Sequence, residues 1–115
     1  MSYRLQELGQ NTTYISEDRN KKNHVVLGGI NEYPGFGMVY DLFVDSGDRG
    51  RGKGLLLARE AINLAREKNL KGVITEVKVD NAIALKTFEK LGFNIIGTFS
   101  QGGQEYYRLS LPFSD

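Results

Sequence analysis

Three glycines spaced two residues apart, Gly50, Gly52 and Gly54, separate a strand-like segment from a helix-like one. Residues 38–44 before them are β-prone, and apolar residues recur at helical spacing after them. The first N–H groups of a helix lack intrahelical partners and lie at the positive end of its dipole. Where Cβ atoms are missing, a diphosphate can approach such groups closely. We therefore predict a phosphate-binding turn made of Arg49, Gly50, Arg51, Gly52, Lys53, Gly54 and Leu55.

Two common glycine-rich phosphate motifs fit this turn poorly. In a P-loop the lysine is followed by Ser or Thr, which binds magnesium, whereas Lys53 is followed by Gly54. A dinucleotide-binding turn has the pattern GxGxxG, and the third glycine is misplaced here. A chain of 115 residues also has little room for a doubled nucleotide-binding fold. The chemistry therefore excludes a nucleotide triphosphatase, and the spacing disfavours a dinucleotide-binding protein.

Residues 44–54 resemble the pyrophosphate motif of the GNAT family of N-acetyltransferases, Arg/Gln-x-x-Gly-x-Gly, with Arg49, Gly52 and Gly54 at its defining positions. Residues 81–93 resemble a second GNAT signature, Asn-x-x-Ala followed by Tyr-x-Lys-x-Gly-Phe. The two motifs occur in the family's order, and the resemblance covers roughly residues 25–111. It implies an α+β, acyl-CoA N-acyltransferase (GNAT-like) fold, with a central mixed β-sheet flanked by helices. We expect a single domain over residues 1–115.

The resemblance also implies a reaction: direct transfer of an acetyl group from acetyl-CoA, the cosubstrate, to a primary amine. The acceptor would be a peptide or protein N-terminus, a lysine or a small amine. The backbone of Leu42, Phe43 and Val44 would pair with the pantetheine arm, and one of their N–H groups would polarise the thioester, which is worth about 3 kcal/mol. Asn81 and Phe88 would also contact the cofactor. A helix cap at Asn81 and core packing at Phe88 are the structural alternatives.

An acceptor that arrives as an ammonium must lose a proton before it attacks. Glu76 is the favoured base because it faces away from Val77 and its neighbours in a predicted strand, beside the expected thioester. A glutamate there also resembles the catalytic glutamate of ribosomal-protein N-terminal acetyltransferases. Asp41 is the second candidate. An ion pair between Glu76 and Lys78 is the structural alternative.

The chain departs from the family pattern in two ways. Many members have a tyrosine, which protonates the leaving thiolate, where this chain has Phe88. Tyr106, Tyr107 or a water would then supply the proton, or the thiolate leaves unassisted. Two helices that usually follow the first strand have no room between Ile15 and Val25. The acceptor site is therefore either open or completed by a homodimer, and a non-catalytic acetyl-CoA-binding or interaction module is the alternative function.

The amino-acid composition limits the kinds of partner that the chain is expected to bind. Lys and Arg number 15 against 14 Asp and Glu, and this net charge of +1 argues against a nucleic-acid-binding protein. The chain has no cysteine and one histidine, His24, so we expect no thiolate or histidine-rich metal site. We find no apolar signal core and no apolar run of membrane-spanning length, so we expect a soluble cytoplasmic protein without a membrane partner.

The segments before the glycine turn are expected to form an antiparallel meander. The glycine pair Gly28 and Gly29 predicts a bulge in its second strand. Residues 17–23 carry many charges and predict a solvated hairpin tip rather than a docking patch. The expected strands are residues 12–16, 24–30 and 38–44.

After the turn, a helix with an apolar stripe is expected to extend from Leu55 to about Lys71 and to stop at Gly72. A strand at residues 73–79 would then lie parallel to the strand before the turn. A short helix capped by Asp80 or Asn81 would end at Gly92. Residues 93–99 and 105–111 would form a closing hairpin.

Overall fold

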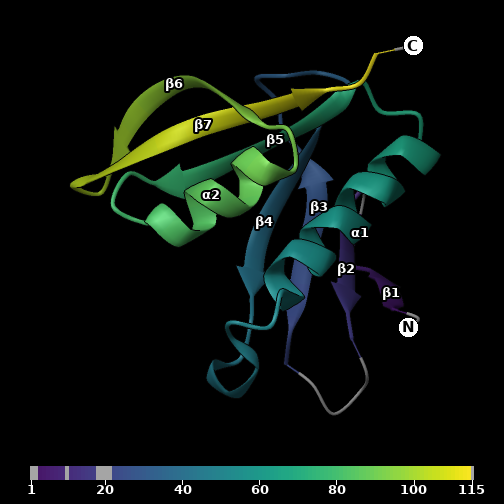
Figure 1. The fold of residues 1–115 in the computed structure, drawn as a ribbon. Coiled ribbons are helices and arrows are strands. Elements are labelled where there is room, and N and C mark those ends of the chain that lie inside the picture. Colours follow the sequence, from purple (N-terminus) through teal and green to yellow (C-terminus); the bar gives the residue numbers. More distant parts are fainter. Residues whose placement is uncertain (1–2, 10, 18–21, 115) are drawn as a thin grey trace.

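The chain is described by a computed structural model that places residues 3–9, 11–17 and 22–114. These residues form one sheet of seven strands with two α-helices, an α+β arrangement as expected (Figure 1). Before the helices come β1 (Arg4–Glu7), β2 (Thr13–Ser16), β3 (His24–Gly29), β4 (Gly37–Phe43) and the 3-10 turn η1 (Ser46–Asp48). The remaining elements are α1 (Lys53–Glu67), β5 (Gly72–Lys78), α2 (Ala82–Lys90), β6 (Asn94–Gln101) and β7 (Gln104–Pro112).

The sheet is mixed, and its strand order is β1-β2-β3-β4-β5-β7-β6. The first four strands form the predicted antiparallel meander. The chain then crosses through α1 and returns as β5, which is parallel to β4. β7 pairs antiparallel with both β5 and β6, which confirms the closing hairpin. At the hairpin tip, Gly102 and Gly103 have φ values of 59° and 79°, which a two-residue turn requires.

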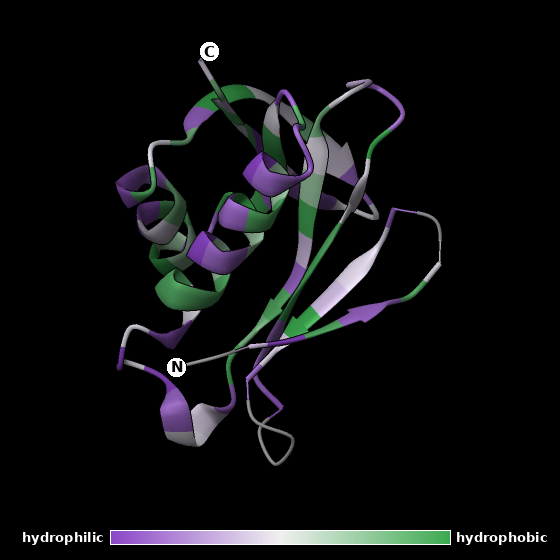
Figure 2. Cartoon of the chain, turned by 90° about the vertical axis from the view of Figure 1, so that its right-hand side faces the viewer, coloured by the Kyte–Doolittle hydropathy of each residue, from purple (hydrophilic) through white to green (hydrophobic). Residues whose placement is uncertain are grey.

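Both helices lie on the same face of the sheet, as the side view in Figure 2 also shows. The predicted apolar stripe of α1 is buried there, and each fully buried aliphatic side chain contributes about 1.5–3 kcal/mol. Alternate residues of the central strands pack against this stripe. The opposite face carries no helix in the described part of the chain. The buried core residues of α1 are Leu57, Ala58, Ala61, Ile62 and Ala65.

In the first half of the chain one strand was missed and one expectation was wrong. β1 was not predicted at all, because its sequence shows no alternation of apolar and polar residues. The bulge lies at the other end of β3 from the glycine pair: the β3–β4 register shifts between His24 and Val26, and Asp41 opposite has a φ of 47°. Gly28 instead packs closely under Tyr40: a Cβ there would lie 2.7 Å from Cε2 of Tyr40, so the ring would have to shift.

The helix ends also differ in detail from the prediction. α1 is followed by Lys68 at the C-cap and by Asn69 with a φ of 60°, so it stops before Gly72. Gly72 opens β5, where a Cβ would lie 2.6 Å from the carbonyl oxygen of Leu111. In α2, Asn81 rather than Asp80 is the N-cap, and Gly92 follows the helix with a φ of 100° as predicted.

Candidate active site

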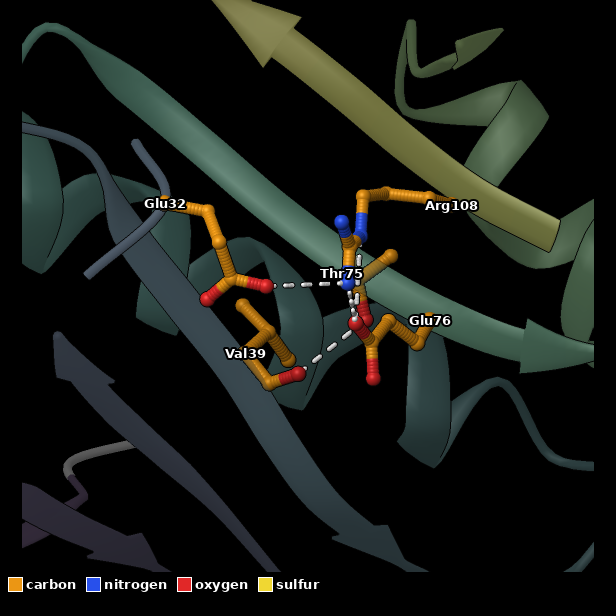
Figure 3. A network of polar contacts seen from close by, with 5 residues as sticks. All are labelled: Glu32, Val39, Thr75, Glu76 and Arg108. Carbon is orange, nitrogen blue, oxygen red and sulfur yellow. Dashed lines mark hydrogen bonds and ion pairs between the residues drawn. The ribbon is translucent and has the colours of Figure 1, made fainter. Parts of the chain in front are cut away.

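β4 and β5 separate partway along their length. They share three parallel pairs, the last of which joins Val39 to Thr75. At that pair the Oγ1 of Thr75 donates a 3.1 Å hydrogen bond to the carbonyl oxygen of Val39 (Figure 3). Beyond it β4 continues to Phe43 and β5 to Lys78 in diverging directions (Figure 1). The divergence opens a gap in the middle of the sheet.

The three predicted pantetheine-binding residues lie along this gap. Asp41, in the left-handed conformation, bends β4 just before them. Leu42 and Val44 are half-buried against the core, and Phe43 is exposed. In the described chain, the edge of this segment that faces β5 makes no strand pairing. This backbone edge is therefore free of strand pairing among the described residues, and its pairing with a pantetheine arm stays a prediction.

The predicted phosphate-binding turn follows directly. Gly50 and Gly52 have φ values of 79° and 76°, in the left-handed region that favours glycine. Gly52 is the N-cap of α1 and offers no side chain to the helix N-terminus. The first intrahelical bond runs from the N–H of Leu56 to the carbonyl of Gly52 at 3.1 Å. The N–H groups of the three residues before Leu56, Lys53, Gly54 and Leu55, therefore have no acceptor within the helix.

Space is available in front of this turn. A Cβ placed at Gly50 or Gly52 would meet no atom within 4 Å. At Gly54, by contrast, a Cβ would point toward β4 and lie 3.6 Å from Cγ2 of Val44. The first two glycines therefore border open space, whereas the third borders the sheet. The N–H groups at the start of α1 therefore lie beside open space, and the binding of an anion there stays a prediction.

The charged side chains of the turn are arranged differently from the expectation. Arg49 and Arg51 are exposed, and the Nε of Arg49 donates to the carbonyl oxygen of Val44 at 3.0 Å. Lys53 was expected to add charge for the anion, but its Nζ lies 2.8 Å from Oε2 of Glu17. A hydrogen bond from Lys53 to a buried carboxylate raises the pKa of the lysine. The ammonium of Lys53 thus stays charged, and the carboxylate of Glu17 balances its charge.

This ion pair also corrects the interpretation of residues 17–23 as a solvated tip. Glu17 is 3% exposed and Asn23 is 0% exposed. Burial alone would raise the pKa of Glu17, but hydrogen bonds from Lys53 and Asn23 outweigh it and lower that pKa. Residues 18–21 of the same segment lie outside the described residues.

Glu76, the predicted base, lies on the face of the sheet that carries no described helix, and it is paired with Arg108 of β7. The Nη2 and Nε of Arg108 lie 2.7 and 3.2 Å from Oε2 of Glu76 (Figure 3). The same Nη2 lies 3.5 Å from Oε2 of Glu32. The alternative pairing of Glu76 with Lys78 was therefore wrong. The hydrogen bond to Glu76 raises the pKa of Arg108.

Sequence reasoning missed Arg108, which contacts the candidate base Glu76. Its guanidinium also lies over the ring of Phe99, 4.8 Å from the centroid, which restricts its orientation. Both of its hydrogen bonds to Glu76 end on Oε2, so Oε1 of Glu76 has no hydrogen-bond partner among the described residues. One oxygen of the carboxylate is fixed by the arginine and the other remains available.

The aromatic candidates divide between the two faces of the sheet. Tyr106 lies on the face of Glu76 and stacks on Phe99, with the ring centroids 5.1 Å apart. Tyr107 lies on the opposite face, against the core beneath the helices. Phe88 is 4% exposed and contacts the ring of Phe93 edge-on, which confirms its predicted packing role.

Two further candidates keep ordinary structural roles. The Oδ1 of Asn81 accepts a 3.1 Å hydrogen bond from the N–H of Ala84, so the predicted cap is confirmed. Asp41, the second candidate base, is exposed at the bulge of β4. Among the described residues there is no group of three His, Cys, Asp or Glu side chains that could hold a metal. None of the described helices has the length and apolar character needed to span a membrane.

Comparison with known families agrees with this geometry. The model of the acetyltransferase (GNAT) family matches residues 3–93, which is most of the chain. The chain therefore belongs to the GNAT family. In this chain we observe a mixed sheet, a gap between β4 and β5, and a glycine turn before α1.

One relative and two solved structures illustrate the likeness. The mycothiol acetyltransferase of Nocardia farcinica is 40% identical over 82 residues, which is 71% of this chain but 27% of that protein. The ribosomal-protein-S18-alanine N-acetyltransferase of Escherichia coli has a TM-score of 0.76 at 17% identity, over 93% of this chain and 72% of that one. An acetyltransferase of Bacillus subtilis, solved in complex with CoA, has a TM-score of 0.76 at 16% identity, over 90% of this chain and 76% of that one.

Proposed function

We propose that this chain is an N-acetyltransferase that moves an acetyl group directly from acetyl-CoA to a primary amine. The observation that carries the proposal is the position of an uncapped helix N-terminus, beyond Gly50 and Gly52, next to a strand edge that β5 leaves unpaired. Family membership supports the same activity, as does the acetyltransferase name of the Nocardia relative.

The residues present fit acetyl-CoA. The N–H groups at the start of α1 would bind the diphosphate, with added charge from Arg49 and Arg51, and Gly50 would allow close approach. The β4 edge would pair with the amides of the pantetheine arm. Asn81 uses Oδ1 for its cap, so its Nδ2 would be the group that contacts this arm. Phe88 would border the arm from the core side.

Acetyl-CoA supplies an activated thioester, and the side chains around the gap would handle the protons. We assign the base to Oε1 of Glu76, which would take a proton from the acceptor ammonium, while Arg108 orients the carboxylate through Oε2. We assign the acid to Tyr106, on the same face, which would protonate the leaving thiolate. An N–H of residues 42–44 would stabilise the oxyanion, a contribution of about 3 kcal/mol.

The acceptor is proposed to be a cationic amine that reaches the open face of the sheet: a peptide or protein N-terminus, a lysine or a small amine. Glu32 and Glu76 present two carboxylates beside Arg108 on this face, and a carboxylate oxygen can pair with an ammonium. A second copy of the chain covering this face would complete an enclosed site. Size-exclusion chromatography with light scattering would separate a monomer from such a homodimer.

Turnover is the deciding experiment. The protein is incubated with acetyl-CoA and a panel of amines and peptides, and free thiol is measured. Release of thiol above the rate of hydrolysis supports the enzyme, whereas tight acetyl-CoA binding without release for every acceptor supports a non-catalytic module.

The base is tested by Glu76→Gln, which should lower kcat by about 10²-fold or more with CoA affinity unchanged. Glu105→Gln, at an exposed carboxylate of β7, is the matched control. An unchanged kcat in Glu76→Gln would remove Glu76 from the mechanism. Tyr106→Phe and Tyr107→Phe, compared at the same pH, would decide which face supplies the acid.

A further inference from the structure

A buried polar cluster joins the glycine turn to the sheet. Its centre is Asn23, which is 0% exposed. The Nδ2 of Asn23 donates to Oε1 of Glu17 at 2.8 Å and to Oδ2 of Asp48 at 3.0 Å. Its Oδ1 accepts from the N–H of Asp45 at 2.6 Å. Glu17 uses its second oxygen, Oε2, to accept from Nζ of Lys53 at 2.8 Å.

These contacts connect segments that are distant in the sequence. Glu17 directly follows β2 and Asn23 directly precedes β3, so both are fixed by the meander. Asp45 and Asp48 lie where the chain leaves β4, and Lys53 is the first residue of α1. One side-chain amide and one carboxylate therefore hold both ends of the segment 45–53. In the described chain, no buried side-chain polar atom lacks a partner, so the cluster is fully satisfied.

Packing cannot hold the turn in the same way. A Cβ at Gly47, Gly50 or Gly52 would meet no atom within 4 Å, so the tip of the segment borders open space. Glycine-rich segments lose much conformational entropy when they are ordered. A ligand that had to order the turn itself would bind more weakly, whereas a turn already held in place avoids that cost. The polar cluster provides this order together with the hydrogen bond from Nε of Arg49 to the carbonyl oxygen of Val44 and the backbone bonds of η1, and it ties the segment to β2 and β3 through buried side chains.

We propose that Asn23, together with Glu17, positions the turn for the diphosphate of the cofactor. Asn23 holds residues 45–48, and Glu17 holds Lys53, so the free N–H groups at the start of α1 converge before the ligand arrives. Lys53 acts through Glu17 as an anchor of the turn and not as a ligand of the anion. This inference rests on the proposed function, because it assumes that the turn binds the diphosphate of CoA.

The test compares a ligand that has the diphosphate with one that lacks it. Dissociation constants for CoA and pantetheine are measured by calorimetry and by NMR titration, for the wild type, for Asn23→Ala and for Thr13→Ala. Thr13 is the matched control, since it is 1% exposed and donates a 2.9 Å hydrogen bond to Glu7 of β1, away from the turn. Thermal unfolding confirms that each variant is folded.

We expect Asn23→Ala to raise the Kd for CoA about tenfold, equivalent to about 1.4 kcal/mol, and to leave the Kd for pantetheine within about twofold. Thr13→Ala should lower thermal stability without changing either constant. If Asn23 had a purely structural role, its substitution would raise the Kd for CoA and the Kd for pantetheine by similar factors. If Asn23→Ala does not fold, Asn23→Ser and Glu17→Gln test the same cluster.

Failure of the proposed function and failure of the positioning role would give different results. Wild-type protein that binds no CoA would overturn the proposed function of the turn. Wild-type protein that binds CoA, with a folded Asn23 variant that binds it equally well, would overturn the positioning role alone.

Discussion

Replacing Gly52 and Gly54 of the glycine turn by alanine should have opposite effects on the stability of the protein. Gly52 has a φ of 76° and a ψ of 10°, a conformation that costs a residue with a Cβ about 1–2 kcal/mol. Gly54 lies inside α1, where alanine is favoured over glycine by up to about 1 kcal/mol. A Cβ at Gly54 would make an ordinary contact with Val44 at 3.6 Å. The free energy of unfolding should therefore fall in Gly52→Ala and should rise or stay level in Gly54→Ala, a difference of about 2 kcal/mol.

CoA affinity should separate the same two variants. In Gly52→Ala the new methyl group occupies space that is open in the free protein and relaxes the turn, so we expect the Kd to rise by at least about tenfold, or about 1.4 kcal/mol. In Gly54→Ala the methyl group points toward β4, so the Kd should stay within about threefold. Urea unfolding and titration calorimetry measure both quantities on the same samples. A folded Gly52→Ala protein with wild-type stability and wild-type CoA affinity would refute the reasoning.

Three other substitutions give direct tests. Phe88→Ala removes a 4% exposed ring from the core and should lower the free energy of unfolding by about 3–5 kcal/mol in urea titration; a smaller loss would contradict its packing role. Asn81→Ala removes the N-cap of α2 and should cost about 1 kcal/mol in the same assay, and no loss would show that the cap is dispensable. Because hydrogen bonds outweigh burial and lower the pKa of Glu17, its stabilisation is present above the ordinary glutamate value of about 4.3 and is lost as the pH falls through the lower folded-state value. Glu17→Gln should therefore reduce the acid-induced loss of stability below about pH 4, and an unchanged pH profile would contradict the ion pair with Lys53.

Features encoded by neighbouring residues could be predicted from the sequence. The spacing of Gly50, Gly52 and Gly54 and the stripe after them located α1 to within two residues, since the helix was expected from Leu55 and begins at Lys53. The cap at Asn81 and the stop at Gly92 are local in the same sense. The antiparallel meander and the closing hairpin followed from the turn signals between their strands, whereas β1 and the position of β7 between β5 and β6 did not.

Features that depend on strand register could not be predicted. Glu76 and Arg108 are 32 residues apart, and they meet because β5 and β7 pair with those two residues opposite each other. A shift of one residue would place Arg108 on the other face. Asn23 likewise reaches Asp48 across 25 residues, through the positions of β3 and η1. The charged sequence of residues 17–23 indicates a surface turn, and nothing local reveals that two of its members are buried.

The two halves of the proposed cofactor site have a common physical origin. Backbone N–H and C=O groups in folded proteins are nearly always bonded to another protein group or to water. Here the β4 edge has no partner in β5 after Val39, where the hydroxyl of Thr75 ends the ladder. The adjacent N-terminus of α1 has no capping side chain, because its N-cap is Gly52. An extended ligand with amide groups along an arm that leads to a diphosphate would satisfy both sets of groups at once, and CoA has that chemistry. A ligand that binds the folded chain and not the unfolded one stabilises it, so CoA should raise the midpoint of thermal unfolding, and pantetheine alone, which lacks the diphosphate, should raise it less.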